Sequence, residues 1–151
     1  MANCEVKISM DFERALRQLG ANIADIEERM LQEGGKVLVE ATKQELRAVI
    51  GNGLKKPSRS TGELESSVGV TRHAFTDRDG NPYVKIGFNE PRRKGNTKIS
   101  NGRLAAIIEY GQHGQPARPF MKRASKRSKS DVESAMKRVF DEEVAKYDGT
   151  S

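Results

Sequence analysis

The sequence has one cysteine, no tryptophan and few aromatic residues, and each shortage excludes a class of protein. Cys4 alone cannot form an intrachain disulfide, and with His73 and His113 it cannot supply the four ligands of a structural zinc site. Aromatic residues make up only 5% of the chain, so a large apolar ligand pocket is not expected. These features favour a reducing, cytosolic setting.

Long hydrophobic runs are also missing. The longest purely aliphatic run is Ala105 to Ile108, whereas a membrane-spanning helix needs about 20 apolar residues. No basic segment followed by an apolar stretch opens the chain, as a secretory signal would. We therefore expect neither secretion nor membrane insertion.

A length of 151 residues predicts a single domain over 1–151.

Charge is abundant but unevenly spread. Residues 1–50 carry seven Lys and Arg against nine Asp and Glu, residues 51–129 carry 17 against six, and residues 130–151 carry three against six. A basic middle between acidic ends indicates either an anionic partner such as nucleic acid or subunits that meet basic surface to acidic surface. A well-solvated surface without a partner is the other interpretation.

The first third of the chain changes from a period of two to a helical period. Apolar and polar residues alternate from Cys4 to Met10, which predicts a strand with Cys4 on its apolar face. Apolar residues then recur every three or four positions from Phe12 to Val49. We predict a short helix, a break near Gly20 and a long helix to about Val49, and the glycines disfavour a coiled coil. The Gly34 and Gly35 pair predicts a kink or close packing.

The middle of the chain predicts a loop, a helical turn and a hairpin. Residues 51–61 hold glycines, a proline and cations typical of an exposed connection, and Ser60 and Glu63 have the spacing of a capping box at a helix start. Alternating residues over 68–76 and 82–89 flank the turn residues between Asp77 and Pro82. This pattern predicts a β-hairpin.

A second exposed loop is expected at 90–103, which has five cations, one acid and no apolar periodicity. A helical turn over Leu104 to Tyr110 ends at Gly111, and Pro119 suits the first position of a long C-terminal helix. The fold class is therefore predicted as α+β. The long N-terminal helix and the C-terminal helix pack on one face of a small, mostly antiparallel sheet with a central hairpin.

Motifs for catalysis or metal binding are not found. The Asp77 to Asn81 stretch has its glycine at the fourth position and Phe88 at the twelfth, which does not fit a calcium loop. His113 could serve acid–base chemistry, but nothing in the sequence supplies its partners, and we interpret it as a loop histidine. There is no nucleophile elbow, phosphate-cradling loop or HExxH motif. We expect no catalytic, metal-binding or cofactor-binding residues.

The basic stretches could contact phosphates without reading bases, since no aromatic residues are interleaved with them. Weak contact with a nucleic-acid backbone, subunit contact and a solvated face all remain open for these stretches. Their cations are Arg92, Arg93, Lys94, Lys98, Arg118, Lys122, Arg123, Lys126, Arg127 and Lys129.

Four segments in order resemble a known family. They are Ser60 to Val68 after a long helix, a β-hairpin, Ile108 to Gly111, and Ala117 to Met121 before the last helix. Together they resemble the minor tail component and head-to-tail joining family of long-tailed bacteriophages, named for gene product ten of Hong Kong phage 97. The resemblance spans about residues 12–145. Gln112 departs from it, because the family usually has threonine after this glycine.

The resemblance implies a structural virion protein without enzymatic activity. Such a protein forms a homo-oligomeric ring, with a hexamer favoured, in the neck or at the top of the tail around the channel used in genome ejection. It would assemble in the host cytoplasm, contact neighbouring neck and tail proteins, and touch genomic DNA without sequence specificity. Candidate subunit-interface residues are Glu109, Tyr110, Gly111 and Arg118, and candidate DNA-channel or partner contacts are Arg92, Arg93, Lys94 and Lys98.

Two other functions are weighed against this one. The stronger is a small basic nucleic-acid-binding accessory protein, which would bind as a monomer or dimer with salt-dependent affinity. The weaker is a small nuclease, for which the sequence lacks the required cluster of carboxylates or histidines.

Overall fold

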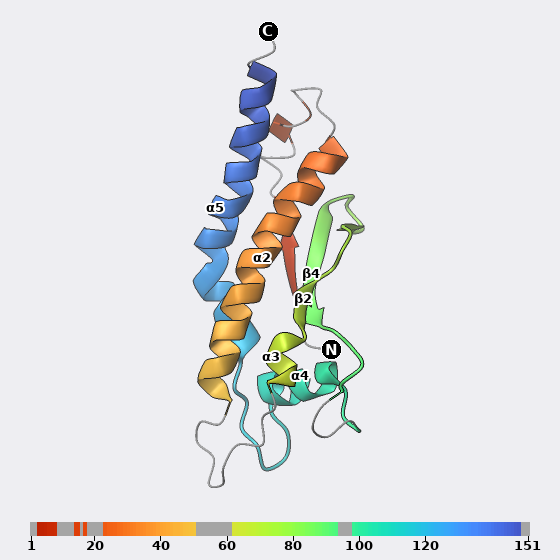
Figure 1. The fold of residues 1–151 in the computed structure, drawn as a ribbon, viewed down its shortest axis with the longest axis vertical. Helices are drawn as coiled ribbons and strands as arrows, with labels where there is room; N and C mark the ends of the chain where they lie inside the picture. Colours follow the sequence, from red (N-terminus) through yellow and green to blue (C-terminus); the bar gives the residue numbers. More distant parts are fainter. Residues whose placement is uncertain are drawn as a thin grey trace.

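The computed structural model describes residues 3–8, 14, 15, 17, 23–50, 62–93 and 98–148. Two long helices run side by side in opposite directions, and a small sheet lies against one of them (Figure 1). These helices are α2 (Ile23–Val49) and α5 (Phe120–Asp148). The chain is α+β, as the sequence predicts.

The sheet is antiparallel with β4 (Pro82–Phe88) at its centre. β1 (Cys4–Lys7) pairs along one side of β4, with Val6 opposite Val84. β2 (Val68–Val70) and β3 (Phe75–Thr76) pair along the other side. The alternation in the sequence is confirmed, because Val6 and Ile8 are buried whereas Glu5 and Lys7 are exposed. Ser9, Met10 and the expected break near Gly20 lie outside the described residues.

The hairpin is present, but its first strand is interrupted between Val70 and Phe75. The side-chain amide of Gln32 on α2 donates to the carbonyls of Thr71 (2.9 Å) and Arg72 (3.0 Å) at this interruption. These bonds satisfy carbonyls that would otherwise pair in a sheet ladder. Thr71 still donates its backbone N–H to the carbonyl of Lys85 on β4 at 3.0 Å, but the strand predicted for 68–76 is interrupted after it, where the carbonyls bond α2 instead.

The glycine pair in α2 marks close packing rather than a helix break. A Cβ on Gly34 would lie 3.0 Å from the side chain of Met136 on α5, and a Cβ on Gly35 would lie 2.8 Å from that of Val70 on β2. α2 therefore approaches both α5 and the sheet at this level, which confirms the predicted close packing. Most of the α2 core residues, such as Met30 and Leu38, are also fully or almost fully buried.

Two short helices differ in their starts from the sequence predictions. α3 (Glu63–Ser66) has Gly62 at its N-cap position, with a φ of 78° and no side-chain cap. Ser60 itself lies outside the described residues. α4 (Asn101–Tyr110) begins three residues before the predicted Leu104, because Ser100 caps it by accepting from the backbone N–H of Arg103 at 3.1 Å. The exposed loop predicted for 90–103 therefore ends before Asn101, which is buried.

Candidate assembly surface

The candidate interface residues from the sequence gather at one end of the molecule. α3, α4 and the connection from α4 to α5 lie at this end, opposite the C-terminus (Figure 1). The predicted loop 51–61 lies outside the described residues. The connection over 111–119 reverses the chain direction, so its geometry decides where α5 begins.

Glu109 is a buried side chain that joins α4 to α5. Its exposed fraction is 6%, and its carboxylate accepts the backbone N–H of Met121 at 2.7 Å and that of Lys122 at 3.1 Å. The first N–H groups of a helix have no partner within the helix, and a carboxylate there also matches the positive end of the helix dipole. Glu109 therefore caps α5 from a different helix.

Gly111 ends α4 in a conformation that only glycine adopts readily, with φ 78° and ψ 175°. A Cβ there would lie 2.7 Å from the backbone nitrogen of Ala117 and 2.8 Å from the carbonyl oxygen of Gln115. Gln112 and Gln115 exchange two backbone hydrogen bonds and form a tight turn with exposed His113 at its tip. The chain therefore folds back closely on Gly111.

Arg118 ties this connection to the far end of α2. Its backbone N–H donates to the carbonyl of Ile108 at 2.7 Å, and its guanidinium donates to the carbonyl of Val49 at 2.8 Å. Val49 is the last residue of α2, where helix carbonyls have no partner within the helix. Arg118 thus caps α2 and fixes the start of α5 beside it.

The two aromatic residues of this region have different environments. Phe120 is fully buried, and its ring packs edge-on against that of Phe88 with centroids 6.2 Å apart. Tyr110 is 67% exposed. Of the four predicted interface residues, Tyr110 presents the largest apolar surface to solvent, whereas Glu109, Gly111 and Arg118 make contacts that shape the connection.

The second predicted set contains the basic residues after β4. Arg92 lies 3.5 Å from the side-chain oxygen of Asn101, and the backbone N–H of Arg93 donates to Glu63 on α3 at 3.0 Å. Lys98 is exposed just before α4. Lys94 lies outside the described residues, and the other three lie between the end of β4 and the start of α4.

Sequence reasoning missed two polar residues that hold the start of α4. The amide of buried Asn101 donates to the carbonyl of Asn89 at 2.9 Å, and the carboxylate of Glu90 accepts the N–H of Gly102 at 2.8 Å. The signal that could have found this start is Ser100, a favoured N-cap residue directly before Asn101.

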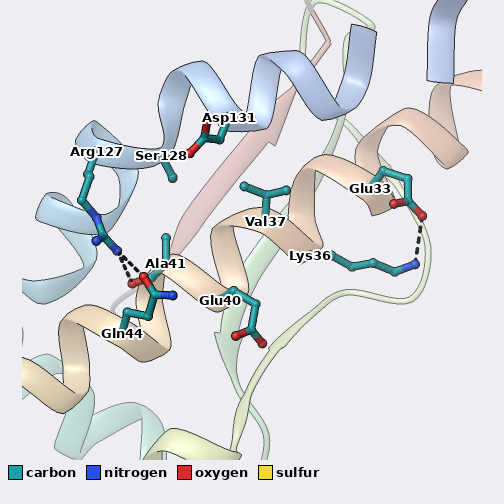
Figure 2. Close-up of a pocket in the computed structure, with 9 residues that line it drawn as sticks. All are labelled: Glu33, Lys36, Val37, Glu40, Ala41, Gln44, Arg127, Ser128 and Asp131. Atoms are coloured by element: carbon teal, nitrogen blue, oxygen red, sulfur yellow. Dashed lines mark hydrogen bonds and ion pairs between the residues drawn. The ribbon is translucent and has the colours of Figure 1, made fainter. Parts of the chain in front are cut away.

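A groove of about 560 Å³ lies elsewhere, between α2 and α5 (Figure 2). Figure 2 shows Val37 and Ala41 extending from α2 toward α5 along it. Charged residues of both signs line the groove, and its only basic residue on α5, Arg127, bonds Gln44 at 3.0 Å and Glu45 at 3.2 Å. Val37 and Ala41 are its only apolar lining residues, whereas small-molecule sites are lined predominantly by apolar side chains.

Burial and, to a smaller extent, the nearby Glu109 carboxylate together raise the pKa of the Cys4 thiol to about 11. Cys4 is half-buried in β1, consistent with a small packing residue rather than a reactive thiol.

Within the parts of the chain that the structure covers, no three His, Cys, Asp or Glu residues gather as metal ligands. No helix in these described parts of the chain is long and apolar enough to cross a membrane.

Comparisons with known proteins give one family. Neither the curated proteins nor the solved structures include a significant match to this chain. Residues 10–111 match the model of the HK97-gp10-like family, described as "Bacteriophage HK97-gp10, putative tail-component". The match runs from before α2 to Gly111, so the cap at Glu109 lies inside it and α5 lies beyond it. Because the match covers more than half of the sequence, this chain belongs to the HK97-gp10-like family of bacteriophage tail components.

Proposed function

We propose that this protein is a structural component of the virion that assembles into a ring at the head–tail junction or the top of the tail. The family match over residues 10–111 carries the proposal, because it identifies a phage tail component. A ring around the DNA channel requires a heterologous contact, in which different surfaces of identical subunits meet and rotation closes the assembly. We favour a hexamer, and the partners would be neighbouring neck and tail proteins.

Charge and exposure support such a contact. The basic middle and acidic ends of the sequence give the subunit surfaces of opposite sign, which suits head-to-tail association. Tyr110, 67% exposed beside a rigid turn, is the apolar anchor of the proposed interface. Glu109, Gly111 and Arg118 would act in the same interface by holding this segment in place.

The basic residues Arg92, Arg93, Lys94 and Lys98 are the proposed contact with DNA in the channel or with a neighbouring protein. Exchanging the first three for glutamine should leave folding nearly intact, since substitutions away from caps and the core usually change stability by about 0.5 kcal/mol or less each. Assembly or DNA passage should suffer instead. Loss of the thermal unfolding transition in this variant would assign the loop a structural role.

The oligomeric state tests the proposal directly. Sedimentation velocity on the purified protein, alone and with virion neck proteins, should give a species well above 16.8 kDa. Tyr110→Ser should reduce that species, and Tyr83→Ser on the sheet is the matched control because it also removes a partly exposed tyrosine. A wild type that stays monomeric in both conditions and is absent from virions would refute the ring.

A further inference from the structure

The first eleven residues of α5 hold five cations and no acid. Residues Phe120 to Ser130 include Lys122, Arg123, Lys126, Arg127 and Lys129, and all five are exposed. The first acidic residue of the helix is Asp131. This composition is confined to the half of α5 that begins at the candidate assembly surface.

Four of these cations have no carboxylate partner within the described parts of the chain. Only Arg127 has one, since its guanidinium lies 3.2 Å from Glu45. Cations in the second half of α5 are paired differently: Lys137 lies 2.8 Å from Asp141, and Lys146 lies 3.0 Å from Glu143. The first part of α5 therefore has one ion-paired cation among five, whereas Lys137 and Lys146 in the rest of the helix form ion pairs with neighbouring carboxylates of α5.

Helix stability does not explain the basic half. Cations near a helix N-terminus oppose the positive end of the helix dipole, and like charges three or four residues apart repel each other. Lys122, Lys126 and Lys129 have this spacing, and they share one side of the helix with Arg123 beside them. The buried Glu109 carboxylate relieves only part of this positive charge, because it is already bonded to the first N–H groups.

We propose that Lys122, Arg123, Lys126 and Lys129 form a binding surface for the phosphate backbone of DNA. A polyanion with closely spaced charges complements a row of cations on one helix side, and such binding needs no base contacts. No aromatic side chain stands among these exposed cations, so binding should be insensitive to sequence. This surface lies on a single subunit. DNA binding by it therefore does not require the proposed ring and can be measured on protein that does not assemble.

Salt dependence of DNA binding tests this surface. The probe is a short, fluorescently labelled duplex of mixed sequence, with anisotropy measured from about 50 to 200 mM salt. Four phosphate contacts predict a slope of log affinity against log salt of about −3.6, and hence an affinity loss of about 150-fold over that range. Exchanging the three lysines for glutamine should bring the slope to about −0.9 and the loss to about fourfold.

A second variant tests whether DNA binding depends on this surface or only on the total charge of the protein. Exchanging Lys137, Arg138 and Lys146 for glutamine removes the same charge from the other half of α5 and should leave the slope near that of wild type. The thermal midpoint of the first variant should not fall, because its lysines oppose the helix dipole. Sedimentation velocity reports the oligomeric state of each protein in parallel.

Several outcomes would overturn the proposal. One is failure of the wild type to bind the duplex at the lowest salt. Another is equal weakening of binding in both variants, which would reduce the effect to net charge. Loss of self-association in the first variant with an unchanged slope would make the cluster a protein contact instead. None of these results depends on whether the ring exists, since DNA binding and oligomerisation are measured separately.

Discussion

The Glu109 carboxylate and the backbone N–H of Met121 form a buried hydrogen bond of 2.7 Å between the end of one helix and the start of another. The same carboxylate accepts from Lys122, so one side chain satisfies two of the first free N–H groups of α5. Arg118 makes the complementary contact with the last carbonyl of α2. A charged pair of caps of opposite sign therefore fixes the connection that carries the proposed interface.

Removing the carboxylate at Glu109 should destabilise the monomer. Glu109→Ala leaves one buried and one partly buried N–H group without an acceptor, which predicts a loss of about 2 to 4 kcal/mol in the free energy of unfolding. Glu109→Gln keeps one acceptor oxygen and should lose less. Urea unfolding with far-UV circular dichroism measures both, and exposed Glu133→Ala is the control. Equal midpoints for Glu109→Ala and the control would show that the cap contributes nothing.

The Cys4 thiol should make stability depend on alkaline pH. Its folded pKa of about 11 is above the ordinary thiol value of 9.0, because burial and the Glu109 carboxylate disfavour the thiolate. A raised folded pKa means that the folded state keeps its proton longer, so this contribution to stability is present below pH 9 and is lost as pH rises toward 11. Cys4→Ala should lack this loss.

Urea midpoints of both proteins, measured between about pH 8 and 10.5, test the Cys4 prediction after subtraction of the variant from wild type. Iodoacetamide should also alkylate the folded protein slowly at pH 8 and faster in urea, since the thiolate is the reactive form. Parallel pH curves for wild type and Cys4→Ala would contradict the assignment.

The elements of the fold follow from local patterns in the sequence. Alternation of Val6 and Ile8 with exposed neighbours, and the four-residue spacing of Ile26 and Met30 in α2, follow from burial of one side of each element. The start of α5 after Pro119 is likewise a local signal. The fold class and the positions of the two long helices could therefore be predicted without the structure.

The contacts of the candidate site could not be predicted in this way, because they join residues far apart in the sequence. Arg118 and Val49 are separated by 69 positions, and Gln32 reaches Thr71 across 39. A glutamate in an apolar helix has the same local signature whether its carboxylate caps another helix or reaches solvent. The sequence identifies Glu109 as a candidate interface residue, but its capping role follows only from the packing of α4 against α5.

Two glycines in the α4–α5 connection give a matched pair of substitutions. Gly114→Ala introduces a Cβ at φ 80° with open space around it and should cost about 1 to 2 kcal/mol from backbone strain alone. Gly111→Ala adds overlap with the backbone of Ala117 to a conformation that only glycine readily adopts, which predicts about 3 kcal/mol or more. Thermal unfolding of both variants measures the difference. Similar midpoints would mean that the chain moves away from Gly111 without cost.

Phe120 and Tyr110 should separate folding from assembly. Phe120→Ala removes a fully buried ring that packs on Phe88 and should cost about 3 to 5 kcal/mol of monomer stability. Tyr110→Ala removes a ring that is mostly in solvent and should change monomer stability by about 0.5 kcal/mol or less. At an interface hot spot, however, the same change should cost about 2 kcal/mol or more of association.

Urea unfolding and sedimentation velocity of Phe120→Ala and Tyr110→Ala distinguish these roles, with Phe75→Ala as the control because Phe75 is the other large exposed hydrophobic residue among those described. Phe75 pairs with Tyr83 on the sheet, away from the α4–α5 connection. If Tyr110→Ala and Phe75→Ala assemble as wild type does, Tyr110 is not the anchor of the subunit contact. If Phe75→Ala alone reduces assembly, the contact lies on the sheet, and the roles of Glu109 and Arg118 are confined to the monomer.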